Sequence, residues 1–170
     1  FGSLVDALAV VAHPDDLEYG AASAIARWRS RGKRVTYLLI SRGEAGIDSM
    51  PPERAGLLRE TEQRDSASVV GVDAVEFLDY RDGVIEYGTP LRRDIARAIR
   101  GHRPEVLVST NYRLLFSGGA LNMADHRWVG LADCTLPETP AIDGISPSCL
   151  PHLCSPGVQS SWSRSTRPPA

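Results

Sequence analysis

The stretch that decides the fold runs from residue 4 to residue 16 and reads LVDALAVVAHPDD. Its first nine residues, Leu4–Ala12, form a nearly continuous apolar run, which is typical of a strand buried on both faces of a parallel sheet. The run ends at a polar His-Pro-Asp-Asp segment, where the chain turns away. We therefore predict a central buried strand that leads directly into side chains able to carry chemistry.

Strand-like and helix-like patterns alternate along the chain as far as residue 133. Further strands are predicted at Val35–Ile40, Ala74–Leu78 and Glu105–Ser109. Helices are predicted at Leu17–Arg31, Glu53–Val70 and Pro90–Gly101, with a shorter helical stretch at Arg127–Ala132. This alternation indicates βαβ crossovers, so we expect an α/β, Rossmann-like fold of three layers around a mainly parallel sheet.

Polar clusters follow the first three predicted strands. His13-Pro14-Asp15-Asp16 comes after the first strand, Arg42-Gly43-Glu44 after the second, and Asp82 after the third. Ligands of parallel α/β sheets bind at the carboxyl ends of the strands, so these clusters predict a functional site. Neither G-x-G-x-x-G nor G-x-x-x-x-G-K-[ST] occurs at a strand end, which argues against a nucleotide-binding domain.

Composition narrows the classes of partner. The 170 residues suit one domain, and the net charge of −2 with a pI near 6.1 argues against nucleic acid and anionic membranes. No apolar run approaches the roughly 18 residues of a membrane span. An odd number of cysteines, three, predicts no disulfide framework, so we expect a cytoplasmic protein. The sequence leaves the oligomeric state open.

His13 and Asp16 lie three residues apart on the turn that leaves the first strand. This spacing lets an imidazole nitrogen and a carboxylate oxygen reach one point, and such mixed ligands suit zinc. Asp15 lies between them in sequence. It can face the same point as a base, or it can contact one of the metal ligands without binding the metal itself. The alternative interpretation is a turn in which Asp15 or Asp16 caps the helix beginning at Leu17.

The dipeptide Asp125-His126 offers a second imidazole near the start of a helical stretch. Taken alone, it also fits a helix N-terminus with a histidine at the surface. A catalytic zinc site uses about three protein ligands and one open position for water. His13, Asp16 and His126 supply that number of ligands, and Asp15 is then free to take a proton.

Together with other motifs, these residues make the sequence resemble a known family. Residues 12–16 (AHPDD), 41–44 (SRGE), 58–64 (LRETEQR) and 124–127 (ADHR) are similar, in this order, to motifs of the PIG-L/LmbE-like zinc deacetylases. Those enzymes remove acetyl groups from N-acetylglucosamine conjugates, and some relatives are amidases. The similarity extends to about Asp133, so residues 1–133 are expected to form the N-terminal part of such a domain.

The resemblance implies a zinc-dependent amide hydrolase that acts on a small N-acetyl amino-sugar conjugate, with another divalent metal such as Fe²⁺ as an alternative to Zn²⁺. It also implies roles for individual residues: His13, Asp16 and His126 as metal ligands, Asp15 as general base, Arg59 and Asp82 as substrate contacts, and Asp125 and Glu44 as supports behind the ligands. For Arg59, a solvated helix charge paired with Glu62 or Gln63 is the alternative.

One position departs from the family pattern. Many relatives carry a histidine three residues before the last metal ligand, where it helps to stabilise the oxyanion, but this chain has Met123 there. Methionine cannot donate a hydrogen bond to an oxyanion. Either the metal carries that charge largely alone, another donor substitutes, or the substrate differs. The rival hypothesis is therefore a sugar- or metal-binding protein without turnover, or an inactive truncated homologue.

Residues 134–170 differ in character from the rest of the chain. Seven of these 37 residues are proline, seven are serine and only four are charged, so we predict an irregular tail. Read one base earlier with permitted codons, residues 138–144 can encode RDAGNRW, a segment with which family members commonly continue. We therefore hypothesise a frameshift near residues 132–134, which would leave the fold incomplete at its C-terminal end.

Overall fold

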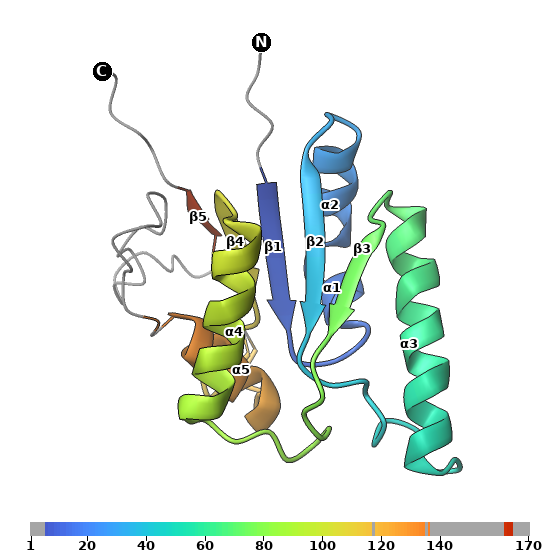
Figure 1. Ribbon diagram of the computed structural model, residues 1–170. Helices are drawn as coiled ribbons and strands as arrows, with labels where there is room; N and C mark the ends of the chain where they lie inside the picture. The colour runs from blue at the N-terminus through green and yellow to red at the C-terminus, as the bar shows by residue number, and fades with distance from the viewer. Residues whose placement is uncertain (1–5, 117, 135, 137–161, 165–170) are drawn as a thin grey trace.

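The computed structural model describes residues 6–116, 118–134, 136 and 162–164, and its centre is one sheet in the order β3-β2-β1-β4-β5 (Figure 1). The strands are β1 (Asp6–Val11), β2 (Arg34–Leu39), β3 (Ala74–Phe77), β4 (Val106–Ser109) and β5 (Trp162–Arg164). Neighbours among β1 to β4 pair in parallel, which confirms the predicted α/β fold with a mainly parallel sheet.

Helices cover both faces of this sheet, as predicted. They are α1 (Asp16–Gly20), α2 (Ala22–Arg29), α3 (Pro52–Val69), α4 (Thr89–His102) and α5 (Ala124–Cys134). Successive residues of β1 point to opposite faces. Ala9 therefore joins a core with Ile25 of α2, whereas Val10 joins a second core with Ile95 of α4 and Val129 of α5. Among these described helices, none combines the length and apolar character that crossing a membrane requires.

The predicted single helix over Leu17–Arg31 is wrong, because the structure divides it into α1 and α2. Ala21 lies between them with φ −137°, well outside helical values. Leu17, Ala21 and Ile25 are all buried in the same core, so the apolar spacing continues through the break. A periodicity of buried residues therefore cannot reveal this break in the backbone.

The strand β5 corrects the expectation of a wholly irregular tail. Residues Trp162–Arg164 pair antiparallel with β4, with Val106 opposite Arg164 and Val108 opposite Trp162. A strand of three residues is too short to show an alternating pattern in a sequence that is otherwise rich in proline and serine. The remaining tail residues, 135, 137–161 and 165–170, lie outside the described residues, so the frameshift hypothesis stays a prediction.

Helix α5 begins earlier than the sequence indicated. The predicted stretch started at Arg127, but α5 starts at Ala124 and thus places Asp125 and His126 in its first turn. An acidic side chain in the first turn interacts favourably with the positive end of the helix dipole. Both residues therefore lie on a rigid element that packs against β1 and β4.

Asp133, in the last turn of α5, provides a stability prediction. It is 6% exposed, and its Oδ1 has no hydrogen-bond partner among the described residues. Burial raises its pKa from 3.8 to about 7, and the Ser109 hydroxyl offsets only part of that rise. Because the folded pKa lies above the unfolded one, the carboxyl group destabilises the fold progressively as the pH rises from about 4 to about 7.

The substitution Asp133→Asn should remove this pH-dependent loss. We expect the variant to gain stability over the parent, and the gain to grow by about 2 kcal/mol between pH 5.5 and pH 8. Urea unfolding at the two pH values measures the difference. Asp73→Asn, at a side chain that is 90% exposed, is the matched control and should show no such growth. A gain independent of pH would contradict the assignment.

Candidate metal centre

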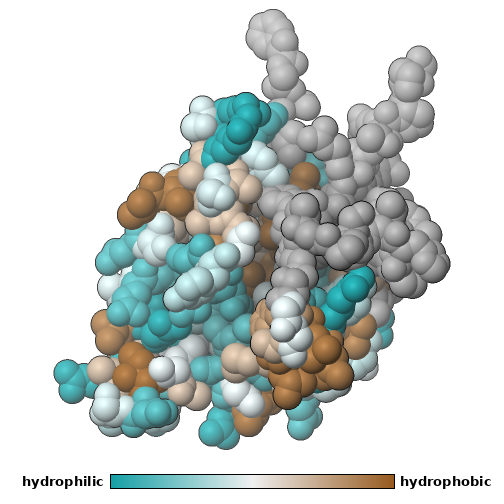
Figure 2. Space-filling model, turned by 180° about the vertical axis from the view of Figure 1, so that it is seen from behind, coloured by the Kyte–Doolittle hydropathy of each residue, from teal (hydrophilic) through white to brown (hydrophobic). Residues whose placement is uncertain are grey.

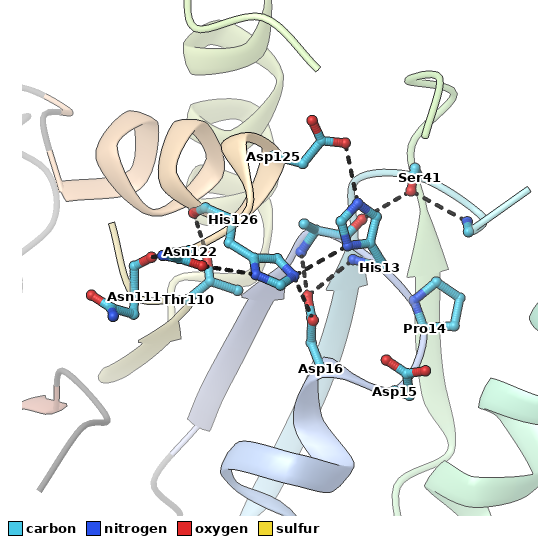
Figure 3. A network of polar contacts seen from close by, with 12 residues as sticks. His13, Pro14, Asp15, Asp16, Ser41, Thr110, Asn111, Asn122, Asp125 and His126 are labelled. Atoms are coloured by element: carbon cyan, nitrogen blue, oxygen red, sulfur yellow. Dashed lines mark hydrogen bonds and ion pairs between the residues drawn. The ribbon is translucent and has the colours of Figure 1, made fainter. Parts of the chain in front are cut away.

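Three segments bring the candidate ligands together at the carboxyl edge of the sheet (Figure 3). His13 follows β1, Asp16 is the first residue of α1, and His126 lies in the first turn of α5, 113 positions after His13. Because β1 and β4 are neighbours, the segment after β4 returns α5 to the end of β1. The His13 Nδ1 and His126 Nε2 atoms lie 3.3 Å apart, and His126 Nε2 lies 2.9 Å from Asp16 Oδ1.

These separations fit a shared divalent cation. All three ligand atoms lie within 4.8 Å of one another. A zinc ion with bonds of about 2.1 Å in tetrahedral geometry places its ligands roughly 3.4 Å apart. Asp16 offers only Oδ1 to this point, since its Oδ2 accepts hydrogen bonds from the Ala12 and His13 amides at 3.0 and 3.1 Å. The donor set of two imidazole nitrogens and one carboxylate oxygen thus suits zinc or iron.

The other nitrogen of each imidazole has an acceptor of its own. His13 Nε2 lies 2.9 Å from Asp82 Oδ1 and 3.1 Å from Asp125 Oδ2, while His126 Nδ1 lies 3.1 Å from Asn122 Oδ1. A proton on each of these nitrogens leaves His13 Nδ1 and His126 Nε2 with free lone pairs. Acceptors placed in this way orient ligating histidines and set their tautomers.

A second group, His13 with Asp82 and Asp125, also meets the distance criterion for a metal site. Its carboxylates are, however, already occupied by backbone donors. Asp82 Oδ2 accepts from the Ala45 amide at 2.9 Å, and Asp125 accepts from Gly83 and Ile85 at 2.7 and 3.2 Å. The group therefore serves to hold the His13 ring, whereas the His13–Asp16–His126 group faces the cavity.

The charges around His13 set its protonation. Burial lowers the pKa of this imidazole, but hydrogen bonds to Asp125 and Asp82 and the negative charge of Asp16 outweigh burial and raise the pKa to about 10. For Asp82, burial raises the pKa, but the contacts with His13 prevail and lower it. A cation that binds at Nδ1 of His13 therefore has to displace a proton, so its affinity increases with pH.

Asp15, the predicted base, is held beside the three ligands by α3. Its backbone lies in the left-handed region with φ 78°, its amide donates to Gln63 Oε1 at 2.9 Å, and its Oδ2 accepts from Arg59 Nη2 at 2.8 Å. Its side chain makes no capping hydrogen bond to α1, so the alternative interpretation as a helix cap is wrong for Asp15. A non-glycine residue in this region is uncommon and is stabilised here by its surroundings.

The residues expected to contact substrate or to support the site have definite positions. Arg59, besides Asp15, donates to the Pro14 carbonyl at 3.0 Å and lies 3.9 Å from Glu62, the partner that the alternative interpretation named. Glu44 accepts from the Asp82 amide at 2.9 Å. Asp82 faces His13 and Ala45, which leaves its carboxylate less free for a sugar hydroxyl than expected.

The ligands line a cavity of about 600 Å³. One part of its wall is polar and contains His13, Asp15, Asp16, Arg59, Asp82 and His126. Another part is apolar and contains Val11, Leu17, Val108, Phe116 and Met123. The volume is in the range of sites for small molecules, which are commonly about 300–1,000 Å³.

Two positioning residues were missed by the sequence analysis. Gln63 is 2% exposed and, besides accepting from Asp15, donates to Glu18 Oε1 at 3.0 Å. Asn122 is 5% exposed, accepts from His126 and donates to the Arg113 carbonyl at 3.0 Å. A polar residue four positions before a ligating histidine was a usable signal for Asn122, whereas Gln63 looks like an ordinary helix-surface residue.

The parallel sheet and the imidazole–carboxylate cluster at its carboxyl edge define an α/β domain with a candidate metal centre in a small-molecule cavity. Within that class, residues 8–135 match the model of the PIG-L family, described as GlcNAc-PI de-N-acetylase. The chain belongs to this family, which confirms the resemblance seen in the sequence.

Individual relatives agree with this assignment. The chain is 29% identical over 155 residues to diacetylchitobiose deacetylase of Thermococcus kodakarensis, an alignment that covers 90% of this chain and 54% of that protein. It is 31% identical over 109 residues to a probable N-acetyl-alpha-D-glucosaminyl L-malate deacetylase 2 of Bacillus anthracis, covering 60% and 48% of the two chains. The chain thus spans about half the length of the curated relatives it matches.

A solved structure shows the same fold. The N,N'-diacetylchitobiose deacetylase of Pyrococcus horikoshii, in complex with its inhibitor MPG, superposes with a TM-score of 0.70 at 25% sequence identity. The match covers 76% of this chain and 48% of that chain. The matched part of this chain therefore has the same fold as this relative.

Proposed function

We propose that this protein is a metal-dependent N-deacetylase that hydrolyses the acetamide group of an N-acetylglucosamine-type conjugate. The observation that carries the proposal is the convergence of His13, Asp16 and His126 on one point of the cavity, beside the carboxylate of Asp15. Family membership and relatives named as deacetylases of N-acetylated sugars support the same reaction.

His13, Asp16 and His126 would hold the cation, with Zn²⁺ expected and Fe²⁺ as the alternative. A divalent cation bound there supplies Lewis-acid polarisation of the acetyl carbonyl and of water. The remaining steps fall to the protein's own groups. Asp82 and Asp125 orient the His13 ring through its Nε2, and Asn122 orients the His126 ring through its Nδ1.

Asp15 is assigned as the general base. Its carboxylate takes a proton from the attacking water while the new C–O bond forms at the acetyl carbon. When the C–N bond breaks, Asp15 returns that proton to the departing amine, so that acetate and the free amino sugar are released. Arg59 holds Oδ2 of Asp15 at 2.8 Å, and Gln63 holds the backbone of the same residue. We assign Arg59 as a positioning residue for the base.

Met123 is the observation that favours a second candidate, a sugar- or metal-binding protein without turnover. Met123 lines the cavity and is 51% exposed, at the position where many relatives carry a histidine. An oxyanion donor contributes on the order of 3 kcal/mol, or a hundredfold or more in rate. We therefore expect turnover that is slow for an enzyme of this kind.

Acetate release from the metal-loaded protein decides between the two candidates. We expect acetate from N-acetylglucosamine conjugates with Zn²⁺ or Fe²⁺ bound, and loss of the activity when a chelator removes the cation. Substituting Met123→His should raise the rate, because an imidazole can donate where a thioether cannot. A protein that binds one metal ion per chain but releases no acetate from any conjugate would support the binding protein instead.

A further inference from the structure

The segment between β4 and α5 exposes five large apolar side chains within ten positions. They are Leu114, Leu115, Phe116, Leu121 and Met123, which we call the apolar rim; their exposed fractions run from 39% for Phe116 to 73% for Leu121. Apolar surface gathers at the lower right of Figure 2, on the side of the molecule where α5 lies. Contiguous exposed apolar surface of this kind commonly marks a binding site.

Hydrogen bonds fix the backbone that presents the rim. Leu115 and Leu121 form an antiparallel bridge, the Phe116 amide donates to the Ala120 carbonyl at 2.8 Å, and the Asn122 amide donates to the Leu114 carbonyl at 2.9 Å. The buried Asn122 side chain ties the same segment to His126. The apolar side chains are thus exposed on an ordered backbone and held in a fixed relation to the metal ligand.

The rim is continuous with the cavity. Phe116 and Met123 belong to the rim and also line the cavity, and the Phe116 ring lies 6.4 Å from the His126 ring in an edge-on arrangement. The polar wall, with Asp15 and Arg59, belongs to the same cavity. A ligand that fills this cavity meets both charged groups and apolar side chains.

The residue types in this segment indicate which groups of a ligand the rim would bind. Across residues 111–123 the only charged residue is Arg113. The five side chains of the rim are themselves uncharged, and alkyl or aromatic groups bound against them would remove apolar surface from water.

We propose that the substrate is an N-acetylglucosamine glycoside whose aglycone is an uncharged apolar group, and that the rim binds this group. The inference rests on the proposed function, because the deacetylation centre places the sugar at the polar wall. Leu115 and Leu121 determine specificity, since they extend the apolar surface beyond the cavity without lining it.

The test compares the octyl and methyl glycosides of N-acetylglucosamine, with the octyl compound kept below its micelle-forming concentration. Binding is measured by calorimetry on the zinc-loaded Asp15→Asn protein, so that hydrolysis does not interfere. We expect the octyl glycoside to bind about tenfold tighter or more, because the rim would remove several of its methylene groups from water. The preference should fall to about twofold when Leu121→Ser or Leu115→Ser is added. Val69→Ser, on α3 and 86% exposed, is the matched control and should keep the preference.

Equal binding of the two glycosides, or a preference that survives both rim substitutions, would overturn the inference. The inference would also fail if Leu121→Ser abolished a dimer, or attachment to neutral lipid vesicles, and left the glycoside preference unchanged. The rim would then bind a second copy of the chain or a membrane. Acetate release from the parent protein is scored separately. Its absence would refute the proposed deacetylation, while the binding preference would still decide the role of the rim.

Discussion

Replacing Asp15 with asparagine is expected to lower kcat for acetate release by about 10²- to 10⁴-fold while leaving the metal content unchanged. General base catalysis contributes a factor of this size, and an amide cannot take up the proton. Asparagine has the same shape and adopts left-handed backbone values readily, so the φ of 78° at this position is preserved. The measurements are acetate release, metal per chain and urea unfolding.

The matched control for this prediction is Asp73→Asn. Asp73 is 90% exposed and lies just before β3, at the opposite end of that strand from the metal centre, so its substitution should change neither rate nor metal content. An Asp15→Asn protein with turnover within tenfold of the parent would exclude Asp15 as the base. If the variant lost both turnover and bound metal, Asp15 would contribute to metal binding and not only to taking a proton from the water.

Replacing His13 with alanine is expected to abolish metal binding and to destabilise the fold by about 3–5 kcal/mol even without metal. The imidazole contacts the carboxylates of Asp82 and Asp125, whose side chains are 8% and 2% exposed. Removing one partner of a buried ion pair leaves an uncompensated charge, which is strongly destabilising. Typical domains are stable by only 5–15 kcal/mol, so the loss should be prominent in urea unfolding with a chelator present.

His126→Ala provides the comparison. It should also abolish metal binding, but its partner Asp16 keeps backbone hydrogen bonds from Ala12 and His13. We therefore expect the metal-free His126→Ala protein to be more stable than His13→Ala by about 2 kcal/mol or more. One metal ion per chain in His13→Ala, or equal stability of the two variants, would contradict the arrangement proposed for His13.

The stability that His13 contributes should depend on pH. Its folded pKa is raised from 6.5 to about 10, so the contribution is fully present below pH 6.5 and is lost as the pH rises through 10. The difference between the parent and His13→Ala should accordingly narrow between pH 7 and pH 10, measured without metal.

Residue patterns along the chain were sufficient for the parallel α/β fold and for the side chains that meet at the candidate metal centre. The apolar run that became β1 can be recognised in sequence because burial on both faces leaves few polar residues in it. His13 and Asp16 could be paired because they lie on one turn. His126 could be grouped with them only indirectly, from the number of ligands that a catalytic zinc site needs and from the order of the family motifs, because it lies 113 positions after His13.

What only the tertiary structure decided is which atoms face each other. Three features of the site depend on contacts between distant segments. They are the orientation of His13, with Nδ1 toward the centre and Nε2 toward Asp82 and Asp125, the pairing of Arg59 with Asp15, and the hydrogen bond of Gln63 to the Asp15 backbone. Local periodicity reports which face of an element is buried, but not which side chain of another element meets it. Packing of α3 and α5 against the ends of β1 determines those meetings, and with them the chemistry available at the site.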